Sequence, residues 1–264
     1  MATVTEVDRL VFFHDADVVD RSPGVLGGLG EDVDGGIEVE VPRYPGFEGA
    51  FDALERRWES WDSASDLAHH FRHTLLDGAD PRPTHVAGAG FGGWVALELA
   101  LMAGRSLESL VLVAPYGVKL FGPMDREFCD VLLLDPAEQV ELGWADPQRC
   151  RDLRMPGFPA DLPDAEHELA FAERATLARY IWKPFLHSRG LSRWFHTIDV
   201  PTLVVVGAQD RMLREGHSRA LAERMPRATY VEIPDAGHYP YLEQPAAFRA
   251  VVADFYNQVK GARR

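Results

Sequence analysis

The chain has 264 residues, of which 46% are hydrophobic, so it is long enough for one domain with a sizeable core. Its 41 acidic and 27 basic residues give a net charge of −14, which argues against nucleic-acid or anionic-membrane partners. Cys129 and Cys150 form neither a disulfide framework nor a zinc spacing, and without a signal-like or membrane-spanning apolar run we expect a cytoplasmic protein.

Short β-rich runs alternate with helical patterns along the chain, which predicts an α/β fold with a mostly parallel sheet and helices on both faces. Near-continuous apolar runs are typical of strands in a sheet that is covered on both sides. We expect strands at residues 10–13, 37–41, 84–87, 110–114, 203–206 and 230–233.

Four helical stretches are expected between and after these strands. Ser22 and Pro23 open the first, and Asp62 or Ser63 caps a second that runs to Leu76. Residues 91–103 form a third, closed by Gly104, and residues 248–259 form the last helix.

Residues 118–198 interrupt the alternation of strands and helices. This stretch contains helical patterns and proline breaks only, which predicts a helical cap inserted into a core formed by residues 1–117 and 199–264. We expect the aromatic residues of the insertion to form mostly the core of the cap: Trp144, Phe158, Phe171, Trp182, Phe185 and Trp194.

Three segments carry candidate chemistry, and each follows a predicted strand. After residues 84–87 comes the tight turn Gly88-Ala89-Gly90-Phe91-Gly92, which matches G-x-S-x-G except for glycine at the tip. Asp210 follows residues 203–206, and His238 lies in a loop before the last helix. Since functional groups gather at the carboxyl ends of parallel strands, we expect these segments to meet there.

This order of elbow, acid and histidine resembles the α/β-hydrolase family with a cap after its sixth core strand. The resemblance extends from about Leu10 to Val259 and implies a histidine, His238, oriented by Asp210. The family's nucleophilic serine corresponds to Gly90, so its acyl-enzyme chemistry has no nucleophile here. The resemblance implies an oxyanion hole formed by the backbone N–H groups of Phe91 and Ala16.

Two further loops depart from the family's pattern. The usual His-Gly after the first core strand reads His14-Asp15, and the loop usually written D-x-P-G-F-G-x-S reads Arg43 to Ala50, with Glu48 in place of glycine. Asp15 is either a functional group beside the oxyanion hole or a solvated loop residue or helix cap. Since glycine has no side chain, we expect Gly90 to leave space for a substrate group or a water molecule beside His238. Trp94 and Tyr116 complete the substrate-binding candidates.

Three functions remain open. The first is a non-hydrolytic enzyme that transfers a proton, for example in epimerisation or isomerisation. It is favoured because three altered loops surround one pocket, and because the chain is similar in type to the peptide-epimerising members of the family. The second is an ester or C–C bond hydrolase silenced at Gly90, and the third is a ligand-binding pseudoenzyme. We expect a small-molecule or modified-peptide substrate, a monomer or homodimer, no cofactor and no metal. His69 and His73 have the spacing of a helical metal pair but no evident third ligand.

Overall fold

Six parallel strands form a single sheet in the order β2-β1-β3-β4-β5-β6. The computed structural model describes residues 7–15, 26, 28–47, 63–77, 80–152 and 164–263. The sheet confirms the predicted fold class and all six predicted strands, which run longer than predicted in most cases. Their bounds are β1 Asp8–Phe13, β2 Ile37–Glu40, β3 Thr84–Ala89, β4 Ser109–Val113, β5 Thr202–Gly207 and β6 Ala228–Ile233.

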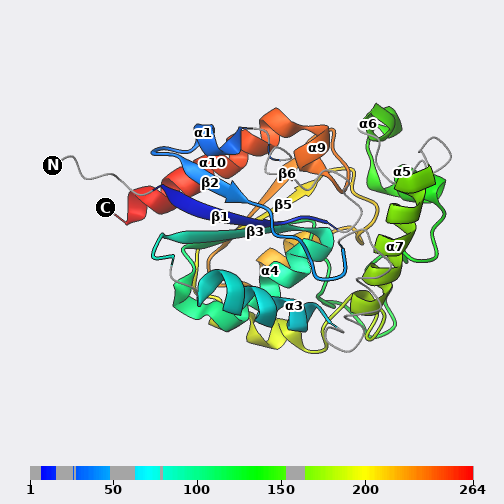
Figure 1. Cartoon of the computed structure of the whole chain (residues 1–264), viewed down its shortest axis with the longest axis horizontal. Coiled ribbons are helices and arrows are strands. Elements are labelled where there is room, and N and C mark those ends of the chain that lie inside the picture. The colour runs from blue at the N-terminus through cyan, green and yellow to red at the C-terminus, as the bar shows by residue number, and fades with distance from the viewer. Residues whose placement is uncertain are drawn as a thin grey trace.

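Helices cover both faces of the sheet, as the apolar strands require (Figure 1). On one face lie α1 (Leu29–Asp32) and α10 (Pro245–Ala262), and on the other lie α3 (Ala64–Phe71), α4 (Gly90–Ala103) and α8 (His217–Ala222). The sheet therefore separates two hydrophobic clusters, one on each side. Two further short helices are η3 (Gly104–Ser106) and α9 (Pro240–Glu243).

The predicted helix boundaries follow from local signals. The Ser63 hydroxyl accepts a hydrogen bond from the Asp66 amide and caps α3, which continues as a π-helical segment, Arg72–Leu76. Gly104 is the C-cap of α4. The predicted opening at Ser22 and Pro23 lies outside the described residues.

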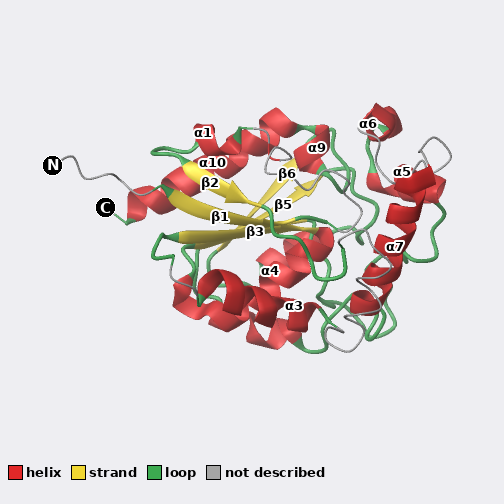
Figure 2. Cartoon of the chain, viewed as in Figure 1, coloured by secondary structure: helices red, strands yellow, loops and turns green. Residues whose placement is uncertain are grey.

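Helices supply the described regular structure between β4 and β5, as predicted. They are α5 (Pro136–Gly143), α6 (Pro147–Asp152), α7 (Asp164–Ile181) and the 3₁₀ segment η5 (Leu191–Thr197). Figure 1 shows α5, α6 and α7 at the end of the sheet toward which the strands point, and Figure 2 shows these helices joined by loops. The segment follows β4, the fourth described strand, and its boundaries as a separate cap stay a prediction.

The prediction that the aromatic residues of this segment form its core is wrong for half of them. Trp144 is buried and Phe185 is partly buried, whereas Phe171, Trp182 and Trp194 are 66%, 64% and 59% exposed. Phe158 lies outside the described residues.

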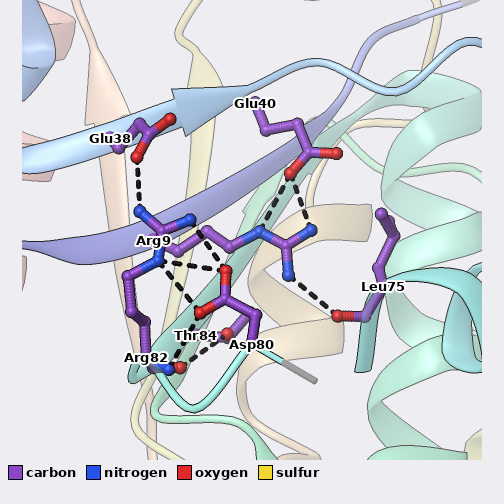
Figure 3. A network of polar contacts seen from close by, with 7 residues as sticks. All are labelled: Arg9, Glu38, Glu40, Leu75, Asp80, Arg82 and Thr84. Atoms are coloured by element: carbon purple, nitrogen blue, oxygen red, sulfur yellow. Dashed lines mark hydrogen bonds and ion pairs between the residues drawn. The ribbon is translucent and has the colours of Figure 1, made fainter. Parts of the chain in front are cut away.

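A polar network joins β1 and the loop before β3 to the edge strand β2 (Figure 3). The Arg9 guanidinium donates to Glu40 on β2 and to the backbone carbonyl of Leu75. Arg82 pairs with Asp80 and with Glu38 on β2. These contacts tie β1 and β2 to the end of the helical segment after α3, so we assign them a structural role.

Among the described residues, no helix is long and apolar enough to cross a membrane. Both cysteines are free thiols, as expected: Cys150 is buried and Cys129 is partly buried.

Candidate active site

Four strands place one candidate residue each at the same edge of the sheet. Asp15 lies two residues after β1, Gly90 follows β3, Asp210 follows β5 and His238 follows β6. Because β1 pairs with β3 so that Phe13 lies opposite Gly88, Asp15 and Gly90, each two residues further on, come side by side.

The elbow is the tight turn that its sequence predicts. Gly90 begins α4 with φ of +48°, in the left-handed region that favours glycine. A Cβ atom on Gly92 would lie 2.1 Å from the carbonyl oxygen of Phe13. The glycines therefore let α4 start directly against β1 and bring the elbow close to Asp15.

The Asp15 carboxylate fills the space that the missing side chain at position 90 would occupy. An ideal Cβ atom on Gly90 would lie 1.8 Å from Oδ2 and 2.3 Å from Cγ of Asp15. Oδ1 of Asp15 accepts a hydrogen bond of 3.1 Å from the Phe91 amide, and the residue is only 2% exposed. The expectation of open space beside Gly90 is thus wrong, and so is the solvated alternative for Asp15, whose carboxylate accepts from a first-turn amide of α4 as a helix cap does.

His238 lies between two carboxylates. Its Nδ1–H donates to Oδ2 of Asp210 at 2.9 Å, and its Nε2 lies 3.4 Å from Oδ2 of Asp15, an ion-pair distance longer than a good hydrogen bond. The amides of Met212 and Leu213 donate to the other oxygen of Asp210 and hold that carboxylate in place. The histidine, 1% exposed, therefore has an acid on each side.

These neighbours determine the charge of the imidazole. Burial alone would lower the pKa of His238, but the charge of Asp210 and the contact with Asp15 outweigh it and raise the pKa to about 10. At neutral pH His238 is therefore a cation. A protonated imidazole can donate a proton or stabilise a negative charge, but it cannot act as a base.

Comparison with known proteins identifies the superfamily. A sequence profile described as "Alpha/beta hydrolase family" matches residues 11–251. The chain belongs to the alpha/beta hydrolase family. It is 29% identical over 198 residues to a protein named "Putative carbamate hydrolase RutD" from Pseudomonas syringae, covering 69% of this chain and 70% of that protein.

Further similarities agree with this assignment. The chain is 25% identical over 194 residues to a 2-hydroxymuconate semialdehyde hydrolase from a Pseudomonas species, covering 71% of this chain and 67% of that protein. A meta-cleavage product hydrolase from Pseudomonas fluorescens has the same fold, with a TM-score of 0.67 at 19% identity over 95% of this chain and 91% of that chain. The chain is thus similar to hydrolytic enzymes, while its elbow has no hydroxyl.

In this alpha/beta hydrolase, one amide expected in the oxyanion hole is already engaged. The Phe91 N–H donates to Asp15, so the protein's own carboxylate stands where an anionic substrate oxygen was expected. The second expected donor, Ala16, lies outside the described residues.

The turn that carries Asp15 is held from two sides. The Tyr44 hydroxyl donates to the carbonyl of His14 at 2.7 Å, and His14 Nδ1–H donates to the carbonyl of Asp15, also at 2.7 Å. Tyr44 and His14 are both fully buried, and their rings lie 4.5 Å apart. His14 thus supports the loop, and these bonds fix the backbone from which the carboxylate reaches His238.

The structure brings one of the two aromatic candidates to the site. The ring of Tyr116 stacks on that of His238, with centroids 5.1 Å apart, and its amide donates to the carbonyl of Gly90. Trp94 is buried, and its indole N–H donates to Ser188 and Glu98. The contacts of Trp94 therefore fasten α4 to the segment before β5, and a role in substrate binding stays a prediction.

Sequence reasoning missed Glu243, which supports the His238 loop. This carboxylate is 8% exposed and accepts hydrogen bonds from the amides of Gly237, Ala145 and Asp146. The His238 amide itself donates to the carbonyl of Gly143 at 2.6 Å. These hydrogen bonds hold the histidine loop against the end of α5. The sequence signal for this role was a carboxylate, Glu243, five residues after the histidine.

A Ser–His–Asp arrangement separate from the candidate site lies at the opposite end of the sheet. His85 contacts Ser109 Oγ at 2.7 Å and Asp8 Oδ2 at 3.3 Å, while Arg263 contacts the same ring nitrogen as Asp8. Burial, more than any other cause, lowers the pKa of His85 to about 4. Because Ser109 and His85 are fully buried, this cluster anchors the end of α10 and offers no accessible nucleophile.

Within the described part of the chain, no group of three or more metal-binding side chains is found. His69 donates to the carbonyl of Ser65 one turn earlier on α3.

Proposed function

We propose that this alpha/beta hydrolase catalyses proton transfer at a carbon atom beside a carbonyl group, as in the epimerisation or isomerisation of an amino-acid residue. The proposed substrate is a small molecule or a modified peptide of natural-product biosynthesis. The observation that carries the proposal is the Asp15 carboxylate in the space beside Gly90, in contact with a protonated His238.

Each group has a definite part in the proposed reaction. Oδ2 of Asp15 accepts the proton as the substrate C–H bond breaks, and the electron pair moves onto the carbonyl oxygen. His238 Nε2–H donates to that oxygen and stabilises its charge, while Asp210 keeps the imidazole oriented and cationic. Delivery of a proton from water to the opposite face, with loss of the Asp15 proton to solvent, gives the epimer, and return of the Asp15 proton to another atom gives an isomer.

The occupied amide favours this chemistry over acyl transfer. Acyl transfer requires a nucleophile at the elbow and a free oxyanion hole. In this chain Gly90 has no oxygen, and the Phe91 amide already donates to Asp15. Asp15 and His238 are each no more than 2% exposed, so substrate entry requires a rearrangement around them.

Solvent exchange tests the proposal. Short N-acetylated peptides that differ in their C-terminal residue are incubated with the protein in D₂O and analysed by mass spectrometry. We expect one deuterium at one α-carbon, with loss of exchange in Asp15→Asn and no change in Asp34→Asn, which alters an exposed carboxylate before β2. Exchange that survives in Asp15→Asn would refute the role of Asp15.

The two alternative functions give different results in the same experiment. Hydrolysis of p-nitrophenyl acetate that depends on His238, without deuterium uptake, would favour a hydrolase. Tight binding of a peptide with neither exchange nor hydrolysis would favour a ligand-binding protein.

A further inference from the structure

Exposed hydrophobic side chains are concentrated in the segment between β4 and β5. In the described ranges, the exposed large hydrophobic residues all lie in this segment, with Val7 as the exception. Exposed apolar residues mark an interaction site where they form a contiguous patch, whereas single exposed residues are common on any protein surface. The residues concerned are Phe121, Met124, Leu133, Phe171, Trp182 and Trp194.

Helix α7 carries an ordered part of this surface. Phe171, Ala175, Ala178 and Trp182 recur at intervals of four, three and four residues, so they lie on one side of the helix. Trp182 follows the last residue of α7, and its amide still bonds to the carbonyl of Ala178. We call these four residues the α7 outer stripe. Phe171 and Trp182 are 66% and 64% exposed, and Ala175 between them is exposed as well.

The other side of α7 packs on the core of the protein. Thr176 donates to the carbonyl of Gly46, and the Tyr180 hydroxyl donates to the carbonyl of Pro45. The Tyr180 ring lies 5.9 Å from that of Phe91, at the start of α4. Figure 1 places α7 at the rim of the molecule. The stripe therefore faces away from the protein, on a helix whose inner side touches the elbow.

We propose that the α7 outer stripe binds the same stripe of a second copy of this chain, with the two helices antiparallel about a two-fold axis. The stripe has a large residue at each end and two small ones between them, so it is complementary to itself when one helix is reversed. Phe171 of one copy then packs on Trp182 of the other, and the alanines let the helices approach closely.

Charges at the two ends of the stripe favour the antiparallel arrangement. Glu168 and Lys183 are exposed near its opposite ends. Reversing one helix brings Glu168 of one copy near Lys183 of the other, whereas parallel helices would bring like charges together. The net charge of −14 disfavours an anionic lipid surface as the occupant.

The interface acts on the site through α7, whatever reaction the site performs. A partner on the outer stripe holds in place the helix whose Tyr180 lies against Phe91. Since each copy carries −14 charges, screening by salt weakens the repulsion between copies and favours the dimer.

Sedimentation velocity over a range of micromolar concentrations tests the inference. We expect a monomer–dimer equilibrium that strengthens with added salt and that Phe171→Ser or Trp182→Ser weakens by at least about tenfold. Trp194→Ser is the matched control, since Trp194 is 59% exposed but lies outside the stripe, and it should leave the equilibrium unchanged. Because the altered side chains are mostly exposed, all three variants should keep the melting temperature of the wild type.

Cross-linking tests the geometry. The double variant Ala175→Cys/Ala178→Cys should form a disulfide-linked dimer under mild oxidation, while Ala262→Cys, exposed on α10, should not exceed the wild-type background. The inference is overturned if the protein stays monomeric at every concentration and salt level, or if its dimer is insensitive to Phe171→Ser and Trp182→Ser. It is also overturned if the stripe binds phosphatidylcholine vesicles while the protein remains monomeric.

Discussion

Gly90→Ser restores a hydroxyl at the elbow, yet we expect it to destabilise the protein and leave it without esterase activity. A Cβ atom at this position would lie 1.8 Å from Oδ2 of Asp15, so the carboxylate has to leave its place. It then loses His238 and the Phe91 amide, and breaking a buried ion pair costs about 3–5 kcal/mol. The left-handed backbone adds about 1–2 kcal/mol for a residue with a Cβ atom.

These terms give a loss of roughly 4–7 kcal/mol in the free energy of unfolding. For a chain of this size each kcal/mol lowers the melting temperature by about 2–4 °C, so Gly90→Ser should melt at least about 8 °C below the wild type. Gly216→Ser is the control, because Gly216 has φ of +78° with no atom within 4 Å of an added Cβ. It carries the backbone strain alone and should melt only a few degrees lower.

The double variant Asp15→Gly/Gly90→Ser separates the clash from the strain. Without the carboxylate, the serine fits beside His238 and the Phe91 amide is free, so we expect a burst of p-nitrophenol from p-nitrophenyl acetate. In a double-mutant cycle, the coupling energy between positions 15 and 90 should be about 3–5 kcal/mol. The reasoning is refuted if Gly90→Ser is as stable as Gly216→Ser, or if Gly90→Ser alone gives the burst.

Three further predictions concern the electrostatics and support of His238. Asp15→Asn removes one of its two carboxylate neighbours, so NMR titration of the imidazole should show a pKa below the value of about 10 and closer to the ordinary 6.5. Because the pKa of His238 is raised in the folded protein, the stabilisation from the His238–Asp15 pair is complete below pH 6.5 and is lost as the pH rises through about 10. Urea unfolding across that range should show the free energy of unfolding decline, and Asp15→Asn should make the decline smaller. Glu243→Gln replaces a carboxylate that accepts three amide hydrogen bonds, so it should lower the free energy of unfolding by about 1.5–3 kcal/mol. Hydrogen exchange at the Gly237 amide should also become faster. Exchange at the wild-type rate would contradict the support of the His238 loop by Glu243.

Much of the fold could be predicted because strands and helix ends are local features. The apolar run 203–206, the cap at Ser63 and the stop at Gly104 each depend on a few adjacent residues. The meeting of His238 and Asp210 followed from their positions after strands of one parallel sheet, with the resemblance to a known family as support.

The position of the Asp15 carboxylate could not be predicted in the same way. It depends on the register that pairs Phe13 with Gly88, and a shift of one residue would turn Asp15 away from Gly90. The exposed stripe on α7 escaped prediction for a related reason. Phe171 and Trp182 are large aromatic residues of the kind that usually lie in a core. Only the packing of Thr176 and Tyr180 on the opposite side shows which face of the helix is buried.

The glycine at position 90 and the aspartate at position 15 depend on each other, because a side chain at position 90 would clash with the Asp15 carboxylate. A side chain at position 90 and a carboxylate at position 15 would occupy the same space, so either one fits only where the other is small or absent. What replaces the hydroxyl is therefore an oxygen supplied from the neighbouring strand, and it lies within ion-pair distance of the same histidine nitrogen. A carboxylate at this place keeps His238 protonated, whereas a serine needs a neutral histidine to take its proton. The exchange thus changes the histidine from a base into an acid, which is why we expect chemistry other than serine hydrolysis from an otherwise ordinary alpha/beta hydrolase.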